Sequence, residues 1–99
     1  MKERFNDQDA IDLYEAILSL KDVEECEAFF SDLCTINELI SMVQRYQVAN
    51  MLDKEMTYTD IAEATSASTT TISRVNRALN YGANGYRTVI DRMKAAKGE

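Results

Sequence analysis

Short hydroxyl side chains and one arginine are the residues best suited to chemistry, and they gather between Tyr58 and Val75. They follow a small polar stretch at residues 65–68 and comprise Thr69, Thr70, Thr71, Ser73 and Arg74. Their hydroxyl and guanidinium groups can form hydrogen bonds with base edges and phosphates in the major groove of DNA. Threonine is β-branched and a middling helix former, so packing alone does not explain three in succession. The simpler interpretation of this run is a helix cap.

The apolar residues around this run have the pattern of a helix-turn-helix. Such a unit packs two short helices at a steep angle across a tight turn, with small and apolar residues at the crossing. Ile61 and Ala62 supply the apolar and small pair, and Ala67 supplies the residue buried after the turn. Ile72 and Val75 supply the inner face of the second helix. The segment of about residues 57–79 is therefore predicted to be a helix-turn-helix whose outer face meets DNA.

One turn position departs from the usual pattern. The position often held by glycine is Ser66 here, and serine tolerates a left-handed backbone less well. Two short helices that cross at an alanine also occur in ordinary helical bundles. The pattern by itself therefore leaves a plain bundle as the alternative.

Apolar periodicity along the whole chain predicts about six helices, so the expected fold class is all-α. The expected ranges are about 7–20, 23–33, 35–52, 58–64, 69–79 and 86–96. Three helix starts pair a capping residue with an acidic residue three positions later: Asp22 with Glu25, Thr35 with Glu38, and Thr57 with Asp60. Gly82 is expected to end the fifth helix as its C′ residue. Three glycines and no proline argue against a turn-rich all-β fold and against a glycine-rich phosphate loop.

The composition argues against an enzyme. The 99 residues include no histidine, which removes histidine-based acid–base catalysis and histidine-ligated metals. The two cysteines, Cys26 and Cys34, lie among apolar residues at a spacing that matches no zinc pattern. We expect both to be buried structural thiols, with a redox role as the alternative. No catalytic or metal-ligating residue is predicted.

Charge is distributed unevenly along the chain. The net charge is −6, but residues 66–99 hold six Lys/Arg against Asp91 and Glu99. An acidic body with a basic C-terminal third is compatible with binding a polyanion through one face. Chance asymmetry on solvated helices is the alternative. No apolar run approaches the roughly 20 residues that span a bilayer, and the N-terminus lacks the apolar core of a signal peptide. A cytoplasmic protein without a membrane partner is expected.

Four stretches of the sequence resemble the tryptophan repressor family. They are residues 33–39 (LCTINEL), Arg45, residues 51–57 (MLDKEMT) and residues 70–74 (TTISR). The resemblance covers roughly residues 30–93 and is closest to the repressor-related proteins of Gram-positive bacteria. It implies an all-helical, intertwined homodimer in which residues 1–99 form one domain. The dimerisation helices would be about 7–52 and 86–96, with a helix-turn-helix projecting on each side.

The resemblance also implies a set of DNA contacts. In this family they come from the helix-turn-helix, which here offers Thr59, Thr69, Thr70, Thr71 and Ser73. Ser68, Arg74 and Arg77 complete the candidate DNA-binding set.

A small-molecule site is implied as well. The sensing member of the family holds an indole ring between two arginines, which match Arg45 and Arg74, and its threonine at a helix start matches Thr35. The residue after the second arginine is glycine there and Val75 here, and a serine four positions after that arginine is Ala78. Valine adds bulk and alanine removes a hydroxyl, so L-tryptophan is not expected as the effector. The arginines could instead bind another small carboxylate, partner-chain carboxylates or phosphate.

These observations predict a dimeric transcription regulator, most simply a repressor, that binds a dyad-symmetric operator in double-stranded DNA. No cofactor is expected beyond a small-molecule co-repressor. The alternative is a protein-interaction module that keeps the repressor fold without DNA binding, which the net negative charge favours.

Overall fold

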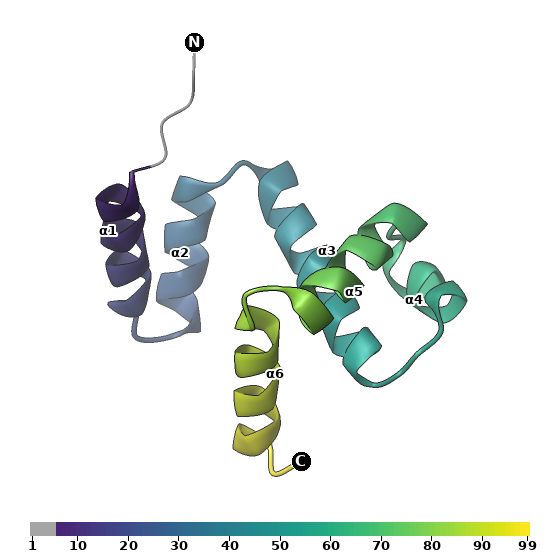
Figure 1. Ribbon diagram of the computed structural model, residues 1–99. Helices are drawn as coiled ribbons and strands as arrows, with labels where there is room; N and C mark the ends of the chain where they lie inside the picture. The colour runs from purple at the N-terminus through teal and green to yellow at the C-terminus, as the bar shows by residue number, and fades with distance from the viewer. Residues whose placement is uncertain (1–5) are drawn as a thin grey trace. The chain divides into compact units, whose positions relative to one another are not determined.

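The computed structural model describes residues 6–99, which form six helices and no strand (Figure 1). The helices are α1 (Asp7–Leu18), α2 (Val23–Leu33), α3 (Ile36–Asp53), α4 (Tyr58–Thr65), α5 (Thr69–Tyr81) and α6 (Gly85–Ala96). The predicted all-α fold is confirmed, and the helix ends differ from the expected ones by two residues or fewer. None of the described helices has the length and hydrophobicity needed to cross a membrane.

The helix starts carry the predicted caps. The amide of Glu38 donates to the Thr35 hydroxyl at 3.1 Å, while the amide of Thr35 donates to the Glu38 carboxylate at 2.7 Å. Thr57 caps α4 by accepting a hydrogen bond from the amide of Asp60 at 3.1 Å. At α2 the predicted reciprocal bond is shifted by one residue, because the Glu25 carboxylate accepts from the amide of Lys21, which precedes the cap residue Asp22. These bonds satisfy amides that have no partner within the helix.

The chain divides into two compact units, residues 1–39 and residues 40–99. In the described part of the first unit, residues 6–39, no side chain is buried. Leu18 at the end of α1 is 82% exposed and Val23 at the start of α2 is 77% exposed. The prediction that both cysteines are buried is wrong for the single chain, since Cys26 is exposed and Cys34 is half-buried. The reason is that α1 and α2 have no core of their own to enclose a thiol.

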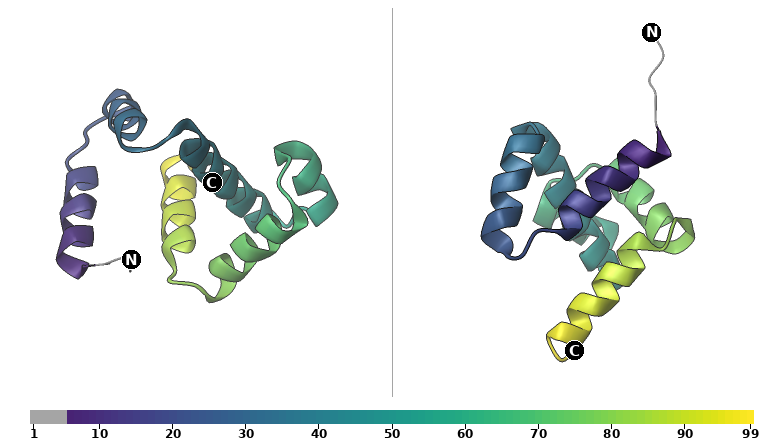
Figure 2. Two further views of the ribbon diagram at one scale, coloured as in Figure 1. Left: turned by 90° about the horizontal axis from the view of Figure 1, so that it is seen from above. Right: turned by 90° about the vertical axis from the view of Figure 1, so that its left-hand side faces the viewer.

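The second unit holds the hydrophobic core. Its buried residues are Val48, Ala49, Ile61, Ala67, Ile72, Val75 and Ile90, which come from α3, α4, the turn after it, α5 and α6. Helix α5 contacts both α4 and α6, as the teal, green and yellow helices of Figure 2 show. The candidate DNA-binding segment therefore rests on a packed support.

A cluster of ion pairs joins the end of α3 to α6. Asp53, whose side chain is only 9% exposed, contacts Arg87 at 2.7 Å and Lys94 at 2.5 Å. Arg87 also contacts Asp91 one turn along α6 at 3.1 Å. Hydrogen bonds from Lys94 and then Arg87 hold the pKa of the Asp53 carboxyl below its usual value. The cluster fixes α6 against the same helix that supports the helix-turn-helix.

The α5–α6 connection differs from the expectation at Gly82. This glycine caps α5 with φ −88°, so it is not left-handed, and the positive φ falls on Asn84 at 71°. Gly82 is needed for a different reason, because a Cβ built there would lie 2.4 Å from the carbonyl oxygen of Ala78. Close backbone approach, and not a left-handed cap, therefore explains the glycine.

Candidate nucleic-acid interface

The helix-turn-helix forms as predicted between α4 and α5. Ser66 ends α4 in the left-handed conformation, with φ 62° and ψ 15°. Ala67, directly after it, is buried, as are Ile72 and Val75 on the inner face of α5. The turn is closed by Thr65, whose hydroxyl donates to the carbonyl of Ile61 at 2.7 Å and accepts from the amide of Ala67 at 3.1 Å. Sequence reasoning missed this role of Thr65, although a threonine before a left-handed residue is a recognisable turn signal.

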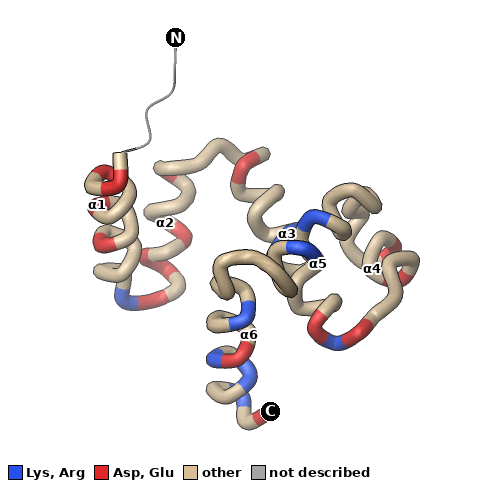
Figure 3. The backbone as a smooth tube through the Cα atoms, viewed as in Figure 1, with Lys and Arg blue, Asp and Glu red and all other residues tan. Residues whose placement is uncertain are grey.

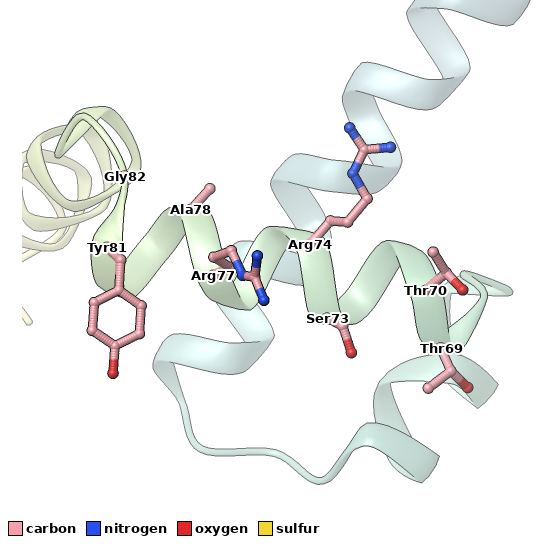
Figure 4. A pocket seen from close by; sticks show the side chains of 8 residues that line it. All are labelled: Thr69, Thr70, Ser73, Arg74, Arg77, Ala78, Tyr81 and Gly82. Atoms are coloured by element: carbon pink, nitrogen blue, oxygen red, sulfur yellow. The ribbon is translucent and has the colours of Figure 1, made fainter.

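The outer face of α5 is an open groove of about 670 Å³ (Figure 4). Its lining residues are Thr69, Thr70, Ser73, Arg74, Arg77, Ala78, Tyr81 and Gly82. In Figure 4, Ser73 and Tyr81 point away from α3, whereas Arg74 extends toward α3. Tyr81 is 86% exposed and was missed by the sequence analysis, although it lies one turn beyond Arg77 on the same helix face.

The remaining predicted DNA-binding residues lie elsewhere. Ser68 is the N-cap of α5, and its hydroxyl oxygen accepts from the amide of Thr71 at 3.1 Å. The Ser68 hydroxyl donates in turn to the Thr71 hydroxyl oxygen at 3.1 Å. Thr71 itself is half-buried. Thr59 is exposed on α4. The groove thus brings together Thr69, Thr70, Ser73, Arg74 and Arg77, and leaves out Thr59, Ser68 and Thr71.

A second pocket, of about 330 Å³, lies between α3, α5 and α6. It is lined by Ser41, Gln44, Arg45, Thr71, Arg74, Val75, Ala78 and Tyr86. Both arginines that the resemblance assigns to an effector therefore line one pocket within a single chain. Val75, only 2% exposed, and Ala78 lie in the same wall. Thr35, the third residue of that set, belongs to the other unit, where it caps α3.

Charge differs between the two helices of the helix-turn-helix. Helix α4 carries Asp60 and Glu63, whereas α5 carries Arg74 and Arg77, as the red and blue segments of Figure 3 show. Among residues 6–99, neither of these arginines nor Arg45 forms an ion pair. A guanidinium group that forms no ion pair can bind phosphate without first breaking a bond to a carboxylate. Among residues 40–99, arginines without an ion-pair partner lie on α3, α5 and α6, and none lies on α4.

Comparison with known proteins gives the family. A family model described as Trp repressor protein matches residues 8–94. The chain belongs to the Trp repressor family. The uncharacterized protein YerC of Bacillus subtilis is 55% identical over 87 residues, which cover 88% of this chain and 84% of YerC. Because the match spans most of both chains, the predicted resemblance is confirmed.

Two solved structures extend the match to three dimensions. A TrpR-like protein from Eubacterium eligens is 58% identical, with a TM-score of 0.84 over 87% of this chain and 89% of that one. A candidate Trp repressor from Staphylococcus aureus is 48% identical, also with a TM-score of 0.84, over 87% of this chain and 86% of that one. The matching family model is that of a repressor, which is a regulator of transcription. In residues 6–99, no group of three or more Cys, Asp or Glu side chains is placed to hold a metal ion.

Proposed function

We propose that this protein is a homodimeric transcription repressor that binds a dyad-symmetric operator through α5. The observation that carries the proposal is the open groove along α5, where hydroxyl groups stand beside unpaired guanidinium groups. Threonine and serine hydroxyls contact base edges, and arginine contacts guanine or phosphate. The matching family model is described as a repressor, which supports the same assignment.

A homodimer is the second part of the proposal. Among residues 6–39 no side chain is buried, and large apolar residues such as Tyr14, Leu18 and Val23 are exposed. Soluble monomers rarely expose apolar patches of more than a few hundred Å². Helices α1 and α2 are also acidic, whereas Arg87, Arg92 and other basic residues lie on α6. We expect α1 and α2 to cover apolar surface on a second copy of the chain. The two DNA-binding units of such a dimer should contact half-sites about 34 Å apart on the operator.

The decisive experiment is selection of genomic DNA fragments with the purified protein. The proposal expects one enriched motif with two-fold symmetry and half-sites spaced by one helical turn. Affinity for that motif should fall steeply as salt rises, because phosphate contacts release counterions. A protein-interaction module would enrich no motif, and that result would contradict the proposal.

Variants along α5 separate base contacts from phosphate contacts. Thr70→Ala should cost about 1–3 kcal/mol at the selected motif and little on random DNA, as expected for a residue that contacts a base. Arg77→Ala should weaken binding to all sequences and lower the salt slope by about one if Arg77 contacts phosphate. Thr71→Ala is the matched control, because its hydroxyl is bonded to Ser68 and lies outside the groove. Electrophoretic mobility shifts over a salt series measure all three, and a larger motif-specific loss for Thr71→Ala would reverse the assignment.

L-tryptophan is not the effector in this proposal. The branched side chain of Val75 fills the wall of the pocket at the position that is glycine in the sensing member of the family. Overpacking against an indole typically costs about 1–3 kcal/mol, and the missing hydroxyl at Ala78 adds to that. Calorimetric titration should show no saturable tryptophan binding below about 1 mM, a concentration that corresponds to roughly −4 kcal/mol. The double variant Val75→Gly with Ala78→Ser should bind tryptophan more tightly than the parent, and unchanged binding would contradict this placement of Val75.

A further inference from the structure

Tyr81 stands at the far end of the groove along α5 (Figure 4). It is the last residue of that helix and is 86% exposed. The next residue is Gly82, where a Cβ would lie 2.4 Å from the carbonyl oxygen of Ala78. Because Gly82 has no side chain, nothing from that position covers the tyrosine ring. The phenol is therefore open to a binding partner.

Tyr81 continues a row of exposed polar side chains on one face of α5. The row consists of Thr69, Ser73, Arg77 and Tyr81, which are all exposed and all line the groove. Residues four positions apart lie one above the other on a helix. The row begins at the end of α5 that is proposed to contact bases, and it finishes at the tyrosine.

The length of α5 places Tyr81 beyond those bases. Each helical residue adds about 1.5 Å, so Tyr81 lies roughly 18 Å along the axis from Thr69. The major groove of DNA is only about 12 Å wide, and a recognition helix contacts base edges through its N-terminal residues. A helix that reads bases with its first turn therefore has its last turn at the sugar–phosphate backbone that borders the groove.

The helix-turn-helix has few charged groups with which to hold that backbone. Within residues 57–81 the basic residues are Arg74 and Arg77, and Arg74 extends toward α3 in Figure 4. Both charged residues of α4 are acidic and repel phosphate. The hydroxyl group of tyrosine also donates to phosphate oxygens, and such contacts fix the register of a protein on the duplex. A phenol one turn beyond Arg77 can supply such a contact without adding charge.

We propose that Tyr81 contacts the sugar–phosphate backbone just outside the bases read by α5, and thereby positions that helix on its half-site. The phenol O–H donates to a phosphate oxygen, and the ring packs on the neighbouring deoxyribose. This inference rests on the proposed function and adds to it a contact that is independent of base sequence.

Protein variants test the contact on the duplex that genomic selection enriches. Tyr81→Ala should weaken binding roughly 5-fold or more on that duplex, and by a similar factor on random DNA. Tyr81→Phe should recover only part of the loss, since it keeps the ring and lacks the hydroxyl. The salt dependence should stay as in the parent, because a neutral side chain releases no counterions. A loss confined to the selected motif, or a lower salt slope, would overturn the proposal.

Two controls exclude indirect effects. Asn80→Ala changes the neighbouring exposed residue, which lies outside the groove and whose side-chain amide donates to the carbonyl of Asn76 at 2.9 Å. This variant should bind DNA like the parent. Light scattering should give the same mass for Tyr81→Ala as for the parent. A smaller mass would place Tyr81 at a contact between copies of the chain and reject the phosphate contact.

Changes in the DNA locate the contact. Uncharged methylphosphonate groups replace one phosphate at a time across the selected motif and its flanks. At one position outside the motif in each half-site, the parent should lose affinity and Tyr81→Ala should lose no more. If every replacement weakens the parent and Tyr81→Ala equally, or if the coupled phosphate lies inside the motif, the proposal is wrong.

The outcomes separate this proposal from the proposed function. A protein that selects a motif, and binds it equally well as Tyr81→Ala, keeps the operator and loses the tyrosine contact. A protein that binds duplex DNA without selecting a motif, yet loses affinity as Tyr81→Ala, rejects the operator and keeps the contact. Failure to bind any duplex would reject both.

Discussion

The α1–α2 region and the α4–α5 region have similar sequence patterns and opposite burial. Both are pairs of short amphipathic helices with capped N-termini. Ile61, Ile72 and Val75 in the second pair are buried, whereas no residue of the first pair is. An apolar stripe therefore specifies a helix and its buried face, but not the partner that covers that face. For α4 and α5 the partners are α3 and α6 of the same chain, and for α1 and α2 we propose a second copy.

The largest expected effect is at the centre of the packed region. Ile61→Ala removes a side chain that is fully buried between helices and should lower the free energy of unfolding by about 2–5 kcal/mol. Thermal or urea unfolding followed by circular dichroism measures this loss. A loss below about 1 kcal/mol would mean that the core of residues 40–99 is not the main source of stability.

The matching change in the exposed region should act through association. Leu18→Asp places a charge in the proposed interface and removes roughly 1.5–3 kcal/mol of apolar burial there. The mass measured by light scattering at micromolar concentration should fall from dimer toward monomer. Gln8→Asp, which adds the same charge at an exposed polar position of α1, should leave the dimer intact. A monomeric parent, or a dimer that survives Leu18→Asp, would contradict the comparison.

A smaller effect is expected at the Asp53 cluster. The pKa of this carboxyl is lower when folded than its usual value near 3.9, so its contribution to stability is present above about pH 4. That contribution is lost as the pH falls through the folded pKa. Because Arg87 and Lys94 are each more than a third solvent-exposed, Asp53→Asn should cost only about 1 kcal/mol at pH 7.

Urea unfolding between pH 2 and pH 7 checks this dependence. The parent and Asp53→Asn should differ at pH 7 and converge at the acidic end. Asp91→Asn, which removes only the exposed partner of Arg87, should change little at any pH. A difference between parent and Asp53→Asn that does not vary with pH would contradict the assigned cause.

The smallest effect is expected from replacing serine by glycine at a helix end, once after α4 and once after α1. Ser66→Gly should stabilise by about 0.5 kcal/mol, since relief of a left-handed serine outweighs the added entropy of the unfolded chain. Ser19→Gly, at the right-handed end of α1, should destabilise by a similar amount because no strain is relieved. The change in urea midpoint relative to the parent measures the effect of each variant. A change of the same sign in both variants would contradict the prediction.

Much of the fold was predictable because its signals are local. The caps at Thr35 and Thr57 depend on residues three positions apart, and the inner face of α5 follows from the spacing of Ile72 and Val75. The left-handed turn at Ser66 was also expected from its place between two helices. Local hydrogen bonding and helical periodicity fix these features before any distant contact forms.

The candidate site was predictable in composition and less so in geometry. Sequence reasoning named the hydroxyl run of α5, but the structure divides it, with Thr70 in the groove and Thr71 bonded to Ser68 beside the pocket. Tyr81 was missed because the helix was predicted to end at about residue 79, whereas α5 extends to Tyr81 and places it one turn beyond Arg77. Which turn of a helix faces a neighbour depends on packing across the whole unit.

The amino-acid sequence alone was enough to predict six helices, the caps at Thr35 and Thr57, the helix-turn-helix and the family. Tertiary structure decided the features that join distant positions: the bond from Gln44 to Thr65, the Asp53 cluster, and the exposure of Cys26 on an uncovered helix. The physical reason is range. Helices and caps depend on neighbours within four residues. The other contacts form only after packing brings together residues 21 to 41 positions apart or leaves a face without a partner.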